Sequence, residues 1–143
     1  MSYLLDTCVL SEFARPEPEP RVAAWLEAQS EEDLYLSSIV LGELARGVAR
    51  LESSTKKRRL SAWLHSDLRP RFRDRVLGVT AEVALRWGEL SGAAARRGIA
   101  VSMADGLIAA TAVVHSLTVV SRNVEDLERA GAMVYSPWER DDD

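Results

Sequence analysis

Short apolar runs alternate along the chain with longer segments in which apolar residues recur every three or four positions. The short runs have the length and composition of β-strands and occupy residues 3–6, 34–37, 76–79, 118–121 and 133–135. The longer segments have helical periodicity and occupy residues 8–14, 21–28, 39–51, 55–68, 81–97 and 103–115. This alternation predicts an α/β fold, a parallel sheet with helices on both faces.

Polar residues at the segment boundaries support this division. Ser38, Thr80, Ser102 and Asn123 each precede a helical segment and are expected to cap it. Segment 103–115 is apolar on nearly every side, which predicts a helix buried among its neighbours.

The size and composition of the chain favour one domain. With 143 residues, 47% of them hydrophobic and 28% charged, the chain has enough apolar side chains for one core. We assign residues 1–136 to a single domain and residues 137–143 to a C-terminal tail. The sequence has no apolar run long enough for a membrane span and no secretory signal, and Cys8 is its only cysteine. We therefore expect a cytoplasmic protein without a membrane partner.

Three carboxylates stand in unusual surroundings. Asp6 follows the first strand run, Glu43 lies among apolar residues early in its helix, and Asp105 opens the apolar segment 103–115. Each also has an ordinary structural interpretation. Asp6 suits a helix cap, Glu43 suits a surface ion pair with Arg46 or Arg50, and Asp105 suits a capping box with Ser102.

The positions of these acids predict a shared site. In parallel α/β folds, functional sites form where the strands end, and that is where the acids recur. Carboxylates brought close together repel one another and require a cation between them. Because the ligands would be oxygens, Mg²⁺ or Mn²⁺ is favoured over Zn²⁺, and such ions commonly also bind substrate phosphates.

Four local motifs carry a resemblance to a known family. They are Leu5-Asp6-Thr7, Ser38 with Glu43-Leu44, Ala104-Asp105 followed by Ile108-Ala109-Ala110, and Ser121-Arg122-Asn123. In these motifs, and over nearly its whole length, the sequence resembles PIN-domain ribonucleases, specifically the VapC toxins of toxin–antitoxin pairs. The resemblance implies a PIN-like three-layer α/β/α fold with a central, mostly parallel sheet of four to five strands.

The resemblance also implies a function and its residues. Asp6, Glu43 and Asp105 would be the catalytic, metal-binding acids, and the supporting residues would be Thr7, Ser121, Asn123 and Asp126. Asn123 stands at a position that is often Asp in the family, which weakens the case for a second metal site. The implied protein is an Mg²⁺- or Mn²⁺-dependent endoribonuclease, the toxin of a type II system. Its partners would be RNA, a VapB-type antitoxin that blocks the site, and a second copy of the chain.

The charge is unevenly distributed, although the net charge is −4. Residues 56–75 hold eight basic side chains against two acidic ones, which makes this segment a candidate for contact with the RNA backbone. Residues 69–75 have the pattern of an exposed loop, in which Phe72 is a candidate to stack on a base. The alternative is a solvated helix face. The eight basic residues are Lys56, Lys57, Arg58, Arg59, Arg69, Arg71, Arg73 and Arg75.

Other chemistries are less well supported. Nothing indicates a Ser-His-Asp triad or a catalytic histidine pair, and Cys8 is expected to pack rather than react. A phosphoaspartyl phosphatase would need a second Asp two positions after Asp6, and a receiver domain would need a late lysine. Two alternatives stay open: a catalytically silent PIN-fold binding module, and another α/β protein that performs phosphoryl chemistry at an acidic site.

Overall fold

A five-stranded parallel sheet forms the centre of the computed structural model, which describes residues 1–139. The strands are β1 (Tyr3–Leu5), β2 (Leu34–Ser37), β3 (Val76–Leu77), β4 (Thr118–Val120) and β5 (Val134–Tyr135). Their order across the sheet is β3-β2-β1-β4-β5, and every neighbouring pair is parallel. Tyr3 lies opposite Leu34 on one side and Thr118 on the other, so β1 is the middle strand.

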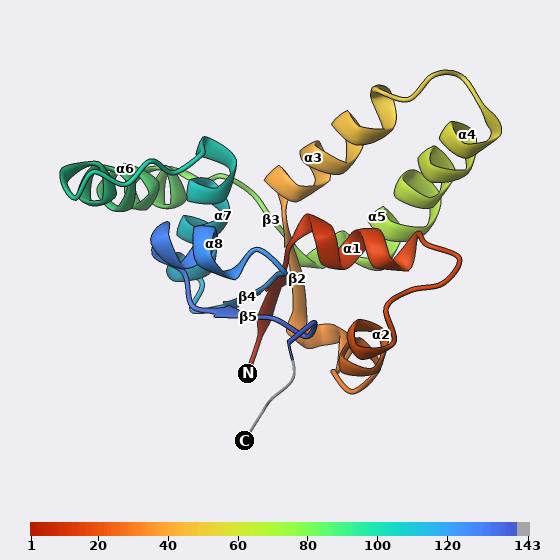
Figure 1. The fold of residues 1–143 in the computed structure, drawn as a ribbon, viewed down its shortest axis with the longest axis horizontal. Coiled ribbons are helices and arrows are strands. Elements are labelled where there is room, and N and C mark those ends of the chain that lie inside the picture. Colours follow the sequence, from red (N-terminus) through yellow and green to blue (C-terminus); the bar gives the residue numbers. More distant parts are fainter. Residues whose placement is uncertain (140–143) are drawn as a thin grey trace.

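Helices connect the strands and cover the sheet. The α-helices are α1 (Thr7–Phe13), α2 (Pro20–Glu27), α3 (Ser38–Ala49), α4 (Thr55–Ala62), α5 (Arg69–Arg71), α6 (Ala81–Arg96), α7 (Met103–Val114) and α8 (Val124–Arg129). A π-helical stretch, Trp63–Leu68, joins α4 to α5, and short 3₁₀ turns lie at Glu31–Asp33 and Arg73–Arg75. In Figure 1 the strands run through the middle of the molecule, with α1 and α2 on one side and α6, α7 and α8 on the other. This arrangement confirms the predicted α/β fold with a parallel central sheet.

The core is built from the middle strands and α7. Leu4, Leu5, Val119 and Val120 are fully buried. Every residue of α7 from Gly106 to Ala112 is buried, as the apolar sequence of segment 103–115 predicts. This burial fixes the position of α7, and with it the position of Asp105 in its first turn.

Several boundary predictions need correction. The cap of α3 is Ser37, whose hydroxyl accepts a hydrogen bond from the Ile39 amide (3.1 Å), because Ser38 is already helical. Asn123 occupies the cap position of α8, but its side chain makes no capping hydrogen bond. Thr80 and Ser102 cap α6 and α7 as predicted.

The segment 69–75 also differs from the predicted loop. It forms α5 and a 3₁₀ turn, and Phe72 is only 1% exposed. The proposed stacking of Phe72 on an RNA base is therefore wrong, because its ring is part of the hydrophobic core. At the C-terminus, Trp138 folds back and is buried, while residues 140–143 of the predicted tail lie outside the described residues. Within residues 1–139, no helix is both long and apolar enough to span a membrane.

Candidate active site at the carboxyl edge of the sheet

The three predicted acids line one hollow where the strands end. The hollow has a volume of about 520 Å³ and is lined by Asp6, Thr7, Cys8, Glu43, Asp105, Arg122 and Asn123. Asp6 follows β1, Glu43 lies on α3 after β2, and Asp105 lies on α7. The parallel strands and the first turn of α7 thus bring together residues that are far apart in the sequence.

Hydrogen bonds hold both the backbone and the carboxylate of Asp6 in place. Its amide donates to the Val120 carbonyl oxygen (3.0 Å), which ties it to β4. One carboxylate oxygen accepts the Thr7 amide (2.8 Å), and the other accepts the Ser121 hydroxyl (2.7 Å). Ser121 in turn accepts the Asn123 amide (2.9 Å). Asp6 is therefore both a helix cap and a member of the site, and its orientation is fixed before any ligand binds.

Glu43 bonds to the site rather than to a surface arginine. Its Oε1 accepts a hydrogen bond from the Thr7 hydroxyl (2.9 Å), and no ion pair links it to Arg46 or Arg50 among the described residues. Partial burial raises the pKa of Glu43, and the negative charges of Asp6 and Asp105 raise it further, while the Thr7 bond opposes the shift. Thr7 therefore links two of the three acids.

Asp105 is anchored by its backbone, which leaves its carboxylate available to the hollow. The Ser102 hydroxyl accepts the Asp105 amide (3.2 Å), so the expected cap is present. Burial raises the pKa of Asp105, and the charges of Asp6 and Asp126 add to this effect, while a hydrogen bond with the Ser102 side chain opposes it. Asp126 is thus close enough to influence the site electrostatically, but Asn123, not Asp126, lines the hollow.

The donor set suits a hard divalent cation. Carboxylate, hydroxyl and amide oxygens are the ligands that Mg²⁺ and Mn²⁺ prefer, and the raised pKa values of Glu43 and Asp105 reflect in part the repulsion that a cation would relieve. In this conformation, no three His, Cys, Asp or Glu side chains among residues 1–139 converge closely enough to hold one ion. Mg²⁺ commonly binds through one or two carboxylates and keeps several waters, so the donors fit such an ion in kind.

Cys8 lies in the hollow but is not suited to act as a nucleophile. Its sulfur accepts the Arg122 amide (3.4 Å) and lies 3.5 Å from the Ser121 hydroxyl oxygen. Burial is the largest cause of the raised pKa of the thiol, which therefore stays protonated and weakly nucleophilic. This geometry agrees with the packing role expected for Cys8.

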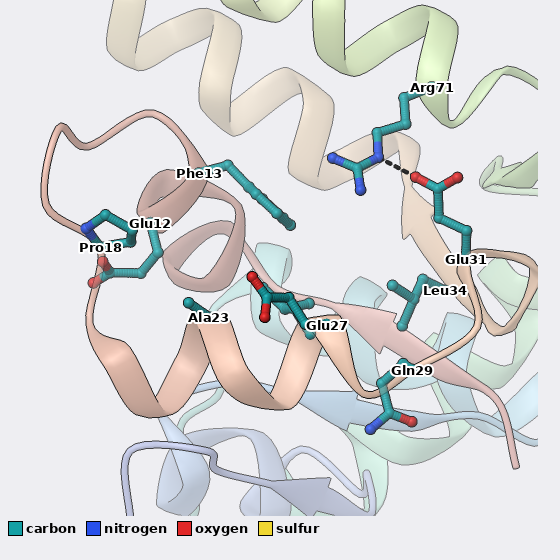
Figure 2. Close-up of a pocket in the computed structure, with 10 residues that line it drawn as sticks. Glu12, Phe13, Pro18, Ala23, Glu27, Gln29, Glu31, Leu34 and Arg71 are labelled. Carbon is teal, nitrogen blue, oxygen red and sulfur yellow. Dashed lines mark hydrogen bonds and ion pairs between the residues drawn. The ribbon is translucent and has the colours of Figure 1, made fainter.

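Three members of the basic segment contact groups outside their own helical segment. Lys57 donates to the Leu51 carbonyl oxygen (3.0 Å), and Arg75 donates to the carbonyl oxygens of Leu34 (2.6 Å) and Arg71 (2.7 Å). Figure 2 shows Arg71 paired with Glu31 at the edge of a cavity of about 370 Å³, which is separate from the acidic hollow. These three side chains brace the fold.

The other basic side chains are more accessible. Lys56 and Arg59 line a hollow of about 400 Å³ that shares Thr7 and Glu43 with the acidic hollow. Arg69 and Arg73 line a different hollow, and Arg58 donates to the Thr55 hydroxyl (3.3 Å). Lys56 and Arg59 are therefore the members of the basic segment that lie beside the acids.

Two residues, one in the acidic hollow and one near the end of α1, were not assigned a role from the sequence. Arg122 lines the acidic hollow, although only its place within a family motif had marked it. Glu12 is 6% exposed, and its carboxylate accepts hydrogen bonds from Arg15 (3.0 Å) and from the Glu19 amide (3.0 Å), which ties the end of α1 to the following loop. Nothing in the local sequence distinguishes Glu12 from an exposed helix residue, because its partners lie beyond the end of its helix.

Comparisons with known proteins agree with this architecture. The family model "PIN domain" matches residues 3–132. The chain is 42% identical over 135 residues to "Toxin FitB" of Neisseria gonorrhoeae (strain ATCC 700825 / FA 1090), covering 94% of this chain and 97% of that protein. It is 36% identical over 136 residues to "VapC ribonuclease Y4jK" of Sinorhizobium fredii (strain NBRC 101917 / NGR234), covering 95% and 97% of the two chains.

A solved structure shares the fold closely. In "Structure of FitAB bound to IR36 DNA fragment", one chain superposes with a TM-score of 0.90 at 39% sequence identity, with 96% of each chain covered. The sheet order, the acidic hollow and these similarities lead to one conclusion: the chain belongs to the PIN-domain family, among the toxins of the VapC type.

Proposed function

We propose that this chain is an Mg²⁺- or Mn²⁺-dependent endoribonuclease and the toxin of a type II toxin–antitoxin system. The observation that carries the proposal is the hollow in which Asp6, Glu43 and Asp105 lie together at the carboxyl edge of the sheet. Relatives of the chain that include "VapC ribonuclease Y4jK" support cleavage of RNA as the activity.

The residues of the hollow have separable tasks in this reaction. Asp6, Glu43 and Asp105 would hold the ion, one or two of them directly and the others through its bound waters. Ser121 and Thr7 orient Asp6 and Glu43 through their hydroxyl groups. A bound ion would supply a water of lowered pKa as the nucleophile and a positive charge that offsets the charge on the leaving oxygen. Asn123 adds an uncharged polar group at the position where the family often has an acid.

The proposed partner is a VapB-type antitoxin. The solved relatives include complexes described as FitAB and VapBC, which supports a partner of this kind. Lys56 and Arg59 line a hollow beside the acids. This hollow also has apolar walls and suits the apolar face of a peptide segment. The walls are formed by Leu44, Val48, Leu60 and Trp63. The homodimer stays a prediction, which light scattering on the purified chain would test.

The test is cleavage of total bacterial RNA by the purified chain with Mn²⁺ or Mg²⁺. We expect cleavage that EDTA abolishes and that Asp105→Asn lowers by at least about a hundredfold, an ordinary loss for an essential active-site group. Asp67→Asn is the matched control, because Asp67 is exposed and outside the hollow. If the wild-type chain and Asp105→Asn are equally inactive, the chain is instead a catalytically silent PIN-fold binding module.

A further inference from the structure

A second hollow adjoins the acidic one and shares two residues with it. It has a volume of about 690 Å³, and both Arg122 and Asn123 line the two hollows. Arg97 and Arg129 also line it, together with Glu125, Glu128 and Glu139. Arg129 is paired with Glu125 (2.8 Å), so Arg97 and Arg122 are the basic side chains of this hollow that have no ion pair with another described residue.

Arg122 stands at the junction of the two hollows. It is the one basic residue that lines the acidic hollow within residues 1–139, and its side chain is exposed. Its guanidinium carbon lies 5.7 Å from the ring centroid of Trp138, within the range of a cation–π contact. Trp138 is buried and therefore provides a fixed support that limits the freedom of the arginine.

An unpaired arginine beside three acids has a clear use in a nuclease. The acids that attract a metal ion also repel the phosphates of RNA, so a substrate strand needs cations on either side of the acidic hollow. A guanidinium donates two parallel hydrogen bonds to a phosphate and remains charged at every working pH.

We propose that Arg122, with Arg97 further along the second hollow, forms a subsite for the RNA phosphate next to the scissile one. The subsite rests on the proposed ribonuclease function and extends it, because it gives the RNA strand a path from the acidic hollow across Arg122 toward Arg97. The glutamates that line the second hollow oppose this path, so the phosphate is held at Arg122, where the two hollows meet, and Arg129 neutralises Glu125. Asn123 lies in both hollows and marks the boundary between the two phosphates.

The test measures cleavage of total bacterial RNA at saturating Mn²⁺ by counting product ends over a series of RNA and KCl concentrations. For Arg122→Ala we expect kcat/KM to fall about tenfold, the effect of losing one charge-assisted hydrogen-bonded contact, with kcat within about threefold of wild type. The slope of log kcat/KM against log salt concentration should become shallower by about 0.7, the value for one phosphate contact on a single strand.

Two further variants separate charge from geometry. Arg122→Lys keeps the charge but not the paired donors, so it should retain the wild-type salt slope with a smaller loss in kcat/KM. Arg50→Ala is the control, because Arg50 is exposed at the C-cap of α3 and lines neither hollow, and it should leave both quantities unchanged.

The outcomes distinguish the two proposals. If the wild-type chain cleaves no RNA, the ribonuclease function itself is wrong. If the wild-type chain cleaves RNA and Arg122→Ala retains the wild-type kcat/KM and salt slope, the ribonuclease function stands and the phosphate subsite is overturned.

Discussion

Two buried serines of the chain, Ser121 and Ser136, differ in what their hydroxyl groups contact. The Ser121 hydroxyl donates to Asp6 and accepts the Asn123 amide. The Ser136 hydroxyl is buried and has no hydrogen-bond partner among the described residues. The two positions therefore form a matched pair. The substitution of serine by alanine removes a hydrogen-bonded hydroxyl group at residue 121 and a hydroxyl group without a hydrogen-bond partner among the described residues at residue 136.

Ser121→Ala should lower the free energy of unfolding by about 1–3 kcal/mol, because it leaves a buried carboxylate oxygen and an amide without a partner. Ser136→Ala should change it by less than about 0.5 kcal/mol or stabilise the fold slightly, since no hydrogen bond is lost. Urea unfolding followed by circular dichroism measures both. Equal losses for the two variants would show that the Ser121 hydroxyl does not hold Asp6 in place.

The raised pKa of Asp105 makes the stability of the chain depend on pH. Because the pKa is higher in the folded than in the unfolded chain, folding favours the protonated form. The free energy of unfolding therefore falls as the pH rises from the ordinary aspartate value of 3.8 through the raised value. Above that pH range the Asp105 carboxylate is charged in both states, and the loss in the free energy of unfolding stays at its full value.

Asp105→Asn should remove this cost while keeping the cap, which uses the backbone amide of residue 105. In EDTA we expect the variant to melt at a higher temperature than wild type at pH 7 and at the same temperature near pH 3. Asp67→Asn, at an exposed position, should show no such divergence. A variant as stable as wild type across the whole pH range would mean that neither burial nor the neighbouring acids disfavour the charged form of Asp105 in the folded chain.

At the scale of elements, the approach of α6 to α7 sets the position of the first turn of α7. The Trp87 ring lies against Gly106, where an added Cβ would come within 2.7 Å of the indole nitrogen. Only glycine allows this contact, and Gly106 follows Asp105 directly. By contrast, a Cβ at Gly88 on α6 would meet nothing within 4 Å.

Gly106→Ala should therefore destabilise the fold by about 1 kcal/mol, because an overpacking cost of about 1–3 kcal/mol exceeds the gain in helix propensity. It should also reduce cleavage, since the displaced turn carries Asp105. Gly88→Ala gains helix propensity at no steric cost and should stabilise the chain by up to about 1 kcal/mol. Thermal unfolding of both variants gives the comparison, and a stabilising Gly106→Ala would contradict the packing described here.

The elements also show which structural features can be predicted from sequence. The periodic segments and the almost entirely apolar α7 are encoded locally, so the sequence predicts the strands, most helices and the burial of α7. The rule that parallel strands end at one edge predicts the proximity of Asp6 and Glu43, which follow β1 and β2. It does not account for Asp105, because α7 follows α6 rather than a strand, and the first turn of α7 brings Asp105 to that edge. The role of Phe72 was predicted wrongly because alternating arginines resemble an exposed loop, whereas in the fold Arg75 bonds to distant carbonyl groups and Phe72 packs beneath its guanidinium. Contacts of this kind, between residues about forty positions apart, leave no local signal.

At the scale of the whole molecule, the fold places three negatively charged side chains around one hollow at an edge of the sheet. A cation bound there should therefore raise the free energy of unfolding of the entire chain. An ion that binds only the folded state stabilises it by mass action, by about 2.7 kcal/mol when its concentration is a hundred times its dissociation constant. The three acids lie on separate elements, α3, α7 and the end of β1, so this stabilisation should appear as a single cooperative shift.

We therefore expect Mn²⁺ to raise the melting temperature of the wild-type chain in proportion to the logarithm of its concentration once the site is saturated. Asp6→Asn keeps a side chain that can cap α1 but removes a charged ligand, so it should lose most of this shift while still folding. Asp67→Asn should retain the full shift, because Asp67 lies outside the hollow. Differential scanning fluorimetry with and without EDTA measures all three proteins. An equal shift in wild type and Asp6→Asn would place the ion elsewhere on the chain, and the acidic hollow would then lose its role as the metal site.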